Sequence, residues 1–270
     1  MATKNERGYA LVTGATSGIG YELAKLFAKD GYNIIAVSRT AESLDRIAEE
    51  FSQQYGVEVL PISKDLFNPD AAMELYEEIK SRNLTVDVLV NNAGQGQYGL
   101  FIDNDIQRQL DIIQLNIASL TAITYYFLQD MVARNEGKIL QLASVASESP
   151  GPYQAVYHAT KAYVLSFTEA LINEVKDTAI TITALQPGVT DTDFFNKADM
   201  QTSKAVQDKS KMADPAGVAK DGYNALMKGD DKAVSGFKNT VQTAMGNIIP
   251  DTLVAEQVRK QQEPVGKDKK

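Results

Sequence analysis

The sequence predicts an α/β fold in which helices cover both faces of a doubly wound parallel sheet, the Rossmann-like arrangement. Short segments rich in Val, Ile and Leu alternate with longer amphipathic segments, and a glycine-rich loop follows the first short segment. This alternation is typical of parallel sheets, because parallel strands need a long crossover, usually a helix, between them. With 270 residues and no internal repeat, we expect a single domain over residues 1–270.

Each element follows from its local pattern. Six apolar segments have the composition of buried strands: Tyr9–Thr13, Asn33–Ser38, Val57–Pro61, Asp87–Asn91, Gly137–Ser144 and Thr181–Gln186. Amphipathic spacing predicts six helices: Gly20–Asp30, Thr40–Tyr55, Asn68–Arg82, Asp105–Arg134, Tyr153–Val175 and Pro215–Met227. A last strand is expected at Ala233–Val234, and Val241–Gln262 is expected to be helical around Pro250.

The composition excludes several classes of function. The chain has no cysteine and one histidine, His158, which rules out disulfides, a cysteine nucleophile and multi-histidine metal sites, so we expect no metal. The 27 Lys and Arg residues against 35 Asp and Glu give a net charge of −8, and an acidic surface repels nucleic acid. No apolar run reaches the roughly 20 residues of a membrane helix, and residues 1–8 do not form a signal peptide. We expect a soluble, cytoplasmic protein that binds neither nucleic acid nor membrane.

The loop Thr13–Gly20 lies between the first predicted strand and the first predicted helix, with glycines at 14, 18 and 20. Glycine permits a sharp turn and lets backbone N–H groups approach a pyrophosphate at a helix N-terminus. The spacing differs from G-x-G-x-x-G and from the P-loop, and a glycine turn without a ligand is the alternative. The strand–loop–helix context favours a dinucleotide site.

The residues after the second strand favour NADP(H) over NAD(H). An acidic residue at that position would bind the ribose 2′-hydroxyl of NAD, whereas an arginine accommodates a 2′-phosphate. The chain has Val37-Ser38-Arg39-Thr40 there, without a carboxylate. Arg39 could bind the phosphate with a charge-assisted fork and Ser38 could donate its hydroxyl; the alternative is a solvated surface arginine.

Tyr157 and Lys161 are four residues apart on a predicted helix, so both side chains lie on one face. A lysine ammonium near the phenol is expected to lower the tyrosine pKa towards neutrality, which suits proton exchange with a carbonyl or an alcohol oxygen. Ser144 ends the fifth predicted strand, where ligands bind in open α/β sheets. An ordinary surface pair and a turn serine are the alternatives.

Together these residues resemble the short-chain dehydrogenase/reductase family over about residues 8–235. The resemblance rests on motifs in order at successive strand ends: Thr13–Gly20, Asp65-Leu66, Asn91-Asn92-Ala93-Gly94, Asn116, Ser144, Tyr157-His158-Ala159-Thr160-Lys161, and Pro187-Gly188 with Thr190 and Thr192. His158 departs from the pattern, which usually has a small or apolar residue there. The resemblance implies an NADP(H)-dependent oxidoreductase that transfers hydride to or from a carbonyl or secondary alcohol.

The resemblance also implies site residues. Asn116, Ser144, Tyr157 and Lys161 match the catalytic tetrad: Tyr157 would be the acid/base, Ser144 would bind the substrate oxygen, Lys161 would hold the nicotinamide ribose, and Asn116 would hold a relay water. The expected cofactor site consists of Gly14, Thr16, Ser17, Gly18, Ile19, Gly20, Ser38, Arg39, Asp65, Leu66, Asn92, Ala93, Gly94, Tyr157, Lys161, Pro187, Gly188, Val189, Thr190 and Thr192.

Substrate residues are expected after the fourth, fifth and sixth strands. The candidates are Gln95, Tyr98, Val145, Tyr153, Phe194 and Phe195. Since this set is apolar with few fixed charges, we expect a small, uncharged, largely apolar substrate. Residues from about 190 to 212 are expected to form a lid, followed by a C-terminal extension from about 238 to 270.

Self-association is expected, because the helices Asp105–Arg134 and Tyr153–Val175 carry apolar residues on more than one side, among them Ile112, Ile123 and Phe127. The family pairs these helices across a two-fold axis, which implies a homodimer or homotetramer; packing on the chain's own sheet is the alternative. Two other functions remain open: an NADP(H)-binding regulator without turnover, although Tyr157 and Lys161 are both present, and a nucleotide-sugar epimerase or dehydratase, which the glycine spacing and the length disfavour.

Overall fold

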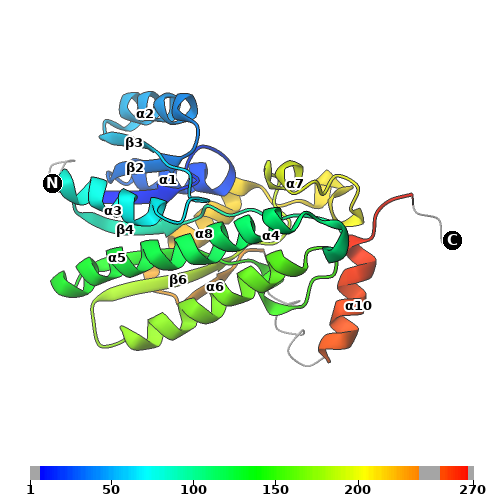
Figure 1. Cartoon of the computed structure of the whole chain (residues 1–270). Helices are drawn as coiled ribbons and strands as arrows, with labels where there is room; N and C mark the ends of the chain where they lie inside the picture. The colour runs from blue at the N-terminus through cyan, green and yellow to red at the C-terminus, as the bar shows by residue number, and fades with distance from the viewer. Residues whose placement is uncertain (1–6, 237–249, 267–270) are drawn as a thin grey trace.

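The computed structural model describes residues 7–236 and 250–266, built around a seven-stranded parallel sheet (Figure 1). The spatial order is β3-β2-β1-β4-β5-β6-β7. The strands are β1 (Tyr9–Thr13), β2 (Asn33–Ser38), β3 (Val59–Ser63), β4 (Val86–Asn91), β5 (Gly137–Leu142), β6 (Ile180–Gln186) and β7 (Lys232–Val234). This confirms the predicted doubly wound sheet, whose order reverses between β1 and β4 and so places a crevice at their carboxyl ends.

Helices cover both faces of the sheet. On one face α1 (Gly18–Lys29), α2 (Ala41–Tyr55) and α8 (Pro215–Lys228) bury Phe27, Phe51 and Leu226 against the strands. On the other face α3 (Ala71–Ser81), α5 (Leu120–Arg134) and α6 (Ala155–Glu174) bury Leu75, Phe127 and Leu171. The central strands β1, β2, β4, β5 and β6 are mostly buried on both faces, which explains why their sequences are largely apolar.

Several element boundaries differ from the prediction. The third strand lies two residues further along than expected, at Val59–Ser63, and the fifth ends at Leu142 because Ser144 caps a 3-10 turn, Val145–Glu148. The expected helix over residues 105–134 consists of α4 (Ile106–Ile113), a π-helical segment (Gln114–Ser119) and α5. The helix expected from Tyr153 begins at Ala155, since Tyr153 has a φ of +69°.

The segment after β6 folds into short pieces: α7 (Phe194–Lys197) and 3-10 turns at Lys204–Val206 and Lys209–Lys211. The helix expected over Val241–Gln262 is described as α10 (Asp251–Gln262), and its expected first part lies outside the described residues. In Figure 1, α7 and α10 lie at the same end of the molecule. No helix in the described ranges has the length and apolar content needed to cross a membrane.

Residues 202–204 and 263–265 join this segment to the end of α10. The Lys204 N–H donates to the Glu263 carbonyl at 3.0 Å, the Val265 N–H donates to the Thr202 carbonyl at 2.7 Å, and Ser203 forms an antiparallel bridge with Pro264. The segment after β6 and the C-terminal helix are therefore held together through their backbones.

Candidate active site

The glycine loop requires glycine for conformational and steric reasons. Gly14 and Gly18 have φ values of +67° and +55°, a left-handed conformation that side chains disfavour. A Cβ on Gly20 would lie 2.3 Å from both the Asn92 amide nitrogen and the Gly14 carbonyl oxygen. The loop therefore packs against the end of β4 with no room for a side chain.

Asn92 and Thr13 hold the loop in place. The Asn92 amide donates to the carbonyl oxygens of Thr13 at 2.8 Å and Gly14 at 3.3 Å, and the Thr13 hydroxyl accepts the N–H groups of Asn92 and Ala93 at 3.0 Å. These bonds link the carboxyl ends of β1 and β4 at the point where the strand order reverses, which is where ligands bind in this type of sheet.

Two observations at this edge fit a bound dinucleotide phosphate. The N-cap of α1, Ser17, makes no side-chain capping bond, so its side chain does not occupy the N–H groups that a helix N-terminus offers to an anion. At the tip of β2 the buried Ser38 hydroxyl has no hydrogen-bond partner among the described residues. Its neighbour Arg39 lies over the Phe67 ring, 5.4 Å from its centroid, and no acidic side chain in the described ranges pairs with it.

Lys161 lies almost completely buried in α6. Its ammonium donates to the Leu142 carbonyl oxygen, at the end of β5, at 2.6 Å. Burial lowers the pKa of Lys161 to about 8, because a cation loses hydration in the protein interior. The ammonium lies 5.9 Å from the centroid of the Tyr157 ring.

The expectation of a lowered Tyr157 pKa is wrong for this structure. Burial raises the pKa of Tyr157 to about 12, and a hydrogen bond with the Ser144 side chain opposes the rise. The reason is that desolvation disfavours the phenolate, while the hydrogen bond of Lys161 is directed to Leu142. At neutral pH the Tyr157 hydroxyl is therefore protonated.

Ser144 is fixed at the start of the turn that follows β5. Its hydroxyl accepts the Ala146 N–H at 3.1 Å and lies 3.4 Å from the Pro187 carbonyl oxygen. The Val145 N–H also donates to the Pro187 carbonyl, at 3.0 Å. The ends of β5 and β6 thus bring Ser144 beside Pro187.

Asn116 lies in the π-helical segment, which interrupts the α4–α5 helix at this residue. Its amide donates to the Gln95 carbonyl at 2.8 Å and to the Thr160 hydroxyl at 3.0 Å, while its oxygen accepts the Gln95 N–H at 3.0 Å. Asn116 therefore links the loop after β4 to α6, behind the cavity wall. A π-helical turn within an α-helix frequently marks a functional site.

A cavity of about 1050 Å³ runs along the carboxyl edge of the sheet and contains most of the sequence-predicted residues. Ser144, Tyr157 and Lys161 line it, together with these expected cofactor and substrate residues: Gly14, Thr16, Ser17, Gly18, Ile19, Ser38, Arg39, Asp65, Leu66, Asn92, Ala93, Gly94, Pro187, Gly188, Val189, Thr190, Thr192, Gln95, Val145, Phe194 and Phe195. Four predicted residues are not in its lining: Gly20, Asn116, Tyr98 and Tyr153. Gly20 and Asn116 instead contact residues that line the cavity: Gly20 packs against Asn92, and Asn116 hydrogen-bonds to the main chain of Gln95.

Tyr98 and Tyr153 hold the C-terminal helix instead of lining the cavity. The Tyr98 hydroxyl donates to the Gln262 carbonyl oxygen at the end of α10, and its ring stacks on Tyr153 at 5.6 Å between centroids. Tyr153 in turn lies under the Arg259 guanidinium, which is 5.5 Å from its ring centroid. Both tyrosines were expected to contact substrate, but they pack against the outer side of the site.

The helix α10 contributes cavity residues that the sequence analysis did not assign. Val254, Gln257, Val258 and Gln261 line the cavity at helical spacing, with Gln262 beside them. Their i, i+3, i+4, i+7 pattern on one helix face was the available signal. That pattern alone does not indicate which part of the fold this helix face contacts.

His158 contacts α10 as a buried, uncharged side chain. Its Nδ1 lies 2.8 Å from the Ser149 carbonyl oxygen and its Nε2 lies 3.3 Å from the Gln262 amide nitrogen. Because the carbonyl can only accept and the amide N–H₂ can only donate, the proton is on Nδ1. Burial, the largest cause, lowers the pKa of His158.

The apolar residues expected to form an interface lie inside the folded chain. Ile112, Ile123 and Phe127 are buried in its own core, because their face of the long helix packs on the sheet. A different apolar row is exposed at the start of that helix: Phe101, Ile102, Ile106, Leu110 and Ile113.

Comparison with known proteins agrees with this geometry. A family model described as short chain dehydrogenase matches residues 8–203. The chain is 37% identical over 185 residues to the very-long-chain 3-oxoacyl-CoA reductase of Anas platyrhynchos, an alignment that covers 66% of this chain and 58% of the relative. The chain thus spans less than two thirds of that relative. It is 30% identical over 253 residues to the uncharacterized oxidoreductase YvrD of Bacillus subtilis (strain 168), covering 88% of this chain and 95% of that one.

A solved structure has the same fold. The alcohol dehydrogenase of the archaeon Thermococcus sibiricus, complexed with 5-hydroxy-NADP, superposes with a TM-score of 0.75 at 26% identity and covers 85% of this chain and 96% of its own. The sheet order, the glycine loop and the family match over residues 8–203 agree. The chain therefore belongs to the short-chain dehydrogenase family.

Proposed function

We propose that this protein transfers hydride between NADP(H) and a carbonyl or secondary alcohol of a small, largely apolar substrate, with Tyr157 as the general acid/base. The observation that carries the proposal is that Ser144, Tyr157 and Lys161 line the same cavity as the glycine loop. A cofactor bound along the loop would reach these three polar side chains. A relative named as a 3-oxoacyl-CoA reductase supports carbonyl chemistry.

The preference for NADP(H) rests on the tip of β2. The unpartnered Ser38 hydroxyl and the Arg39 guanidinium both line the cavity, and Lys64 lies nearby in the same lining. A 2′-phosphate would satisfy the hydroxyl and pair with the cation. The neighbour complexed with 5-hydroxy-NADP supports this preference.

The proton chemistry follows from burial. When bound, the cofactor supplies or accepts the hydride. The Tyr157 hydroxyl, whose pKa is about 12, carries a proton at neutral pH and can donate it to a substrate oxygen. Ser144, which hydrogen-bonds to Tyr157, would bind the same oxygen. The protonated phenol is the form that donates the proton in carbonyl reduction.

Lys161 supports proton donation by its charge. Since its pKa is about 8, the ammonium is mostly protonated at neutral pH. A cation in a poorly hydrated site stabilises negative charge that develops on the Tyr157 oxygen as the proton leaves. The Asn116 amide donates hydrogen bonds to Gln95 and Thr160. These bonds would hold the first turns of α6 in a fixed position relative to the loop after β4.

The cavity composition supports an uncharged substrate. Its apolar part includes Val145, Phe194, Phe195, Val254 and Val258, and α10 adds the amides of Gln257, Gln261 and Gln262. The cation Lys197 in the lining is paired with Asp193 at 3.0 Å, so it offers no free charge to a carboxylate. Residues 190–212 and α10 would act together as a cover, because residues 202–204 and 263–265 join them.

A homodimer or homotetramer is also proposed, through the exposed apolar row that includes Ile106 and Leu110. Monomeric proteins rarely expose contiguous apolar patches of this kind. The cytoplasmic location stays a prediction of the sequence.

The test is turnover of a panel of uncharged aldehydes and ketones with NADPH and NADH, followed by nicotinamide absorbance. We expect oxidation of NADPH by at least one ketone, and a loss in Tyr157→Phe of at least about 100-fold with little change in NADPH binding. Turnover that survives this substitution would contradict the role of Tyr157. NADPH binding without turnover of any substrate would favour the regulator instead.

A further inference from the structure

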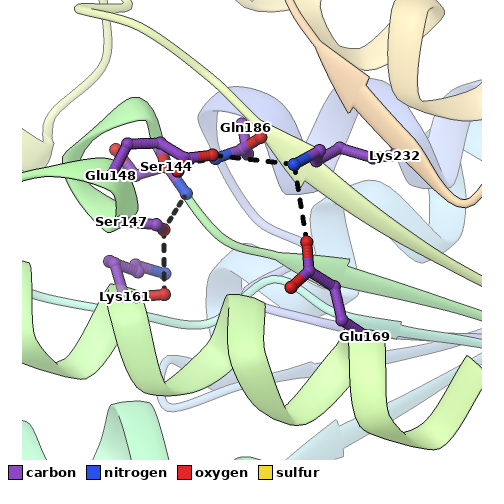
Figure 2. Close-up of polar contacts among 7 residues, drawn as sticks. All are labelled: Ser144, Ser147, Glu148, Lys161, Glu169, Gln186 and Lys232. Carbon is purple, nitrogen blue, oxygen red and sulfur yellow. Dashed lines mark hydrogen bonds and ion pairs between the residues drawn. The ribbon is translucent and has the colours of Figure 1, made fainter. Parts of the chain in front are cut away.

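The main chain of Ser144 is held from both sides by side chains (Figure 2). Its N–H donates to the Ser147 hydroxyl at 3.3 Å, and its carbonyl accepts the Gln186 amide at 3.3 Å. The Ser147 hydroxyl donates to the main-chain carbonyl of Lys161 at 2.8 Å. Two residues of the proposed active site, Ser144 and Lys161, are therefore linked through Ser147.

Gln186 is the last residue of β6 and is fully buried. Its Nε2 donates to the Ser144 carbonyl and, at 2.9 Å, to the Glu148 carboxylate. Its Oε1 has no hydrogen-bond partner among the described residues. A half-turn of the amide would place Oε1 against these two acceptors, so the network fixes the orientation of the amide.

The bond to Glu148 sets this orientation. A hydrogen bond to a carboxylate is stronger than one between neutral groups, and Glu148 is mostly buried. Beyond Glu148 the chain of contacts continues to Lys232, 3.7 Å away, which lies 3.4 Å from Glu169 on α6. These outer ion pairs are half-exposed, and pairs of that kind contribute little. The buried Gln186–Glu148 pair is therefore the effective part.

We propose that Gln186, oriented by Glu148, is a positioning residue that keeps the Ser144 hydroxyl directed at the substrate oxygen. This proposal rests on the proposed function. The Gln186 amide holds the carbonyl of the same residue whose hydroxyl bonds to Tyr157. Without this contact the Ser144 carbonyl keeps the bond from the Ser147 N–H at 3.0 Å, but the turn after β5 loses one of its links to the end of β6. A displacement of Ser144 by a fraction of an ångström would weaken the hydrogen bond that stabilises the transition state and would leave cofactor binding intact.

A double-mutant cycle with Ser144 tests the proposal. Gln186→Met removes both donors and keeps the side-chain size. We expect kcat for carbonyl reduction to fall about tenfold in the wild-type background and less than about twofold in Ser144→Ala, because residues that act through one another are not additive. The KM for NADPH should change less than about twofold. An equal fall in both backgrounds, or no fall in the wild type, would overturn the proposal.

Gln141→Met is the matched control. Gln141 is also a fully buried strand glutamine, three residues before Ser144, and its amide donates to Thr124 and not to Ser144. We expect a similar loss of stability to that of Gln186→Met, with kcat within about twofold of the wild type. A fall of kcat as large as in Gln186→Met would assign the effect to general loosening of the sheet.

An exchange of the side chains at positions 186 and 148 distinguishes the effect of the hydrogen bond to the Ser144 carbonyl from the effect of the bond between positions 186 and 148. The double variant Gln186→Glu with Glu148→Gln keeps an amide–carboxylate bond between positions 186 and 148, but it removes the donor to the Ser144 carbonyl. We expect this variant to remain slow, and full recovery would overturn the proposal. If Gln186→Met does not fold, the less buried Glu148→Ala replaces it, with a smaller fall in kcat that should again vanish in Ser144→Ala.

These outcomes also distinguish the two proposals. If Ser144→Ala retains full activity, the proposed role of Ser144 fails and the positioning role fails with it. If Ser144→Ala is slow but Gln186→Met is as fast as the wild type, only the positioning role fails.

Discussion

The Lys161 ammonium donates its hydrogen bond to the Leu142 carbonyl oxygen at 2.6 Å, and its pKa is about 8 because it is buried. An unfolded lysine ionises near 10.5, so between these two pH values the unfolded chain binds one more proton than the folded chain. Stability should therefore rise with pH from about 8 to about 10.5 through this group. Below pH 8 both states are protonated, and the cost of burying the charge is constant.

Lys161→Met should remove this pH dependence. We expect the variant to unfold at a higher urea concentration than the wild type at neutral pH, and the difference should shrink as the pH rises towards about 10. Urea unfolding without cofactor measures it. The exposed Lys220, changed to Met, is the control and should show no such convergence. A constant difference across this range would contradict the assigned cause.

Arg39→Ala should raise the KM for NADPH by about tenfold or more and leave the KM for NADH nearly unchanged, because only NADPH carries the 2′-phosphate. Steady-state kinetics with both cofactors measure the ratio. Arg46→Ala, an exposed arginine on α2 outside the cavity, is the matched control. Equal effects on both cofactors would refute the assignment of Arg39.

Gly20→Ala should weaken NADPH binding and lower thermal stability, since its Cβ would lie 2.3 Å from the Gly14 carbonyl oxygen. Gly217→Ala is the contrasting variant, because a Cβ there meets nothing within 4 Å. It should stabilise α8 by roughly 0.4–1 kcal/mol. Thermal unfolding and NADPH fluorescence titration measure the two effects. A neutral Gly20→Ala would show that the loop has room to move.

Tyr98→Phe should raise the KM for the carbonyl substrate about fivefold, because one hydrogen bond that holds α10 is lost. The KM for NADPH should stay unchanged. Tyr76→Phe removes a comparable hydroxyl contact, to Asp130 at 3.2 Å between α3 and α5 and outside the cavity lining, and it should leave both KM values unchanged. An increase in the KM for NADPH of the same size would contradict a role confined to the cover.

Ile106→Glu should shift the protein towards the monomer, because it places a charge in the exposed apolar row of α4. Sedimentation velocity measures the distribution. Met73→Glu changes a similarly exposed apolar residue on α3 and should not alter it. A wild-type protein that sediments as a monomer would end the proposal of self-association.

The strands and the glycine loop could be predicted because their signals are local. A buried parallel strand is a short apolar run, and Thr13–Gly20 is recognisable wherever it occurs. The rule that ligands bind at the carboxyl ends of parallel strands located Ser144, and the family resemblance predicted that Tyr157 and Lys161 share its site. The π-helical turn at Asn116 had no comparable signal, because its residues continue the helical pattern on both sides.

Long-range contacts and burial could not be predicted from local pattern. Tyr98 and Tyr153 are aromatic residues near the expected site, but only the path of the chain decides that they meet Gln262 and Arg259 and not the substrate. The pKa of Tyr157 is raised by desolvation, and a hydrogen bond with the Ser144 side chain opposes the rise. The spacing of Tyr157 and Lys161 indicated the cation and gave no measure of the desolvation.

The backbone pairing of residues 202–204 with 263–265 has a practical consequence for engineering. Its bonds join main-chain groups, so side-chain substitutions other than proline should leave the pairing in place. A library that randomises both stretches without proline, with Tyr98 kept constant, would let new substrate preferences emerge while the two pieces remain fastened to each other.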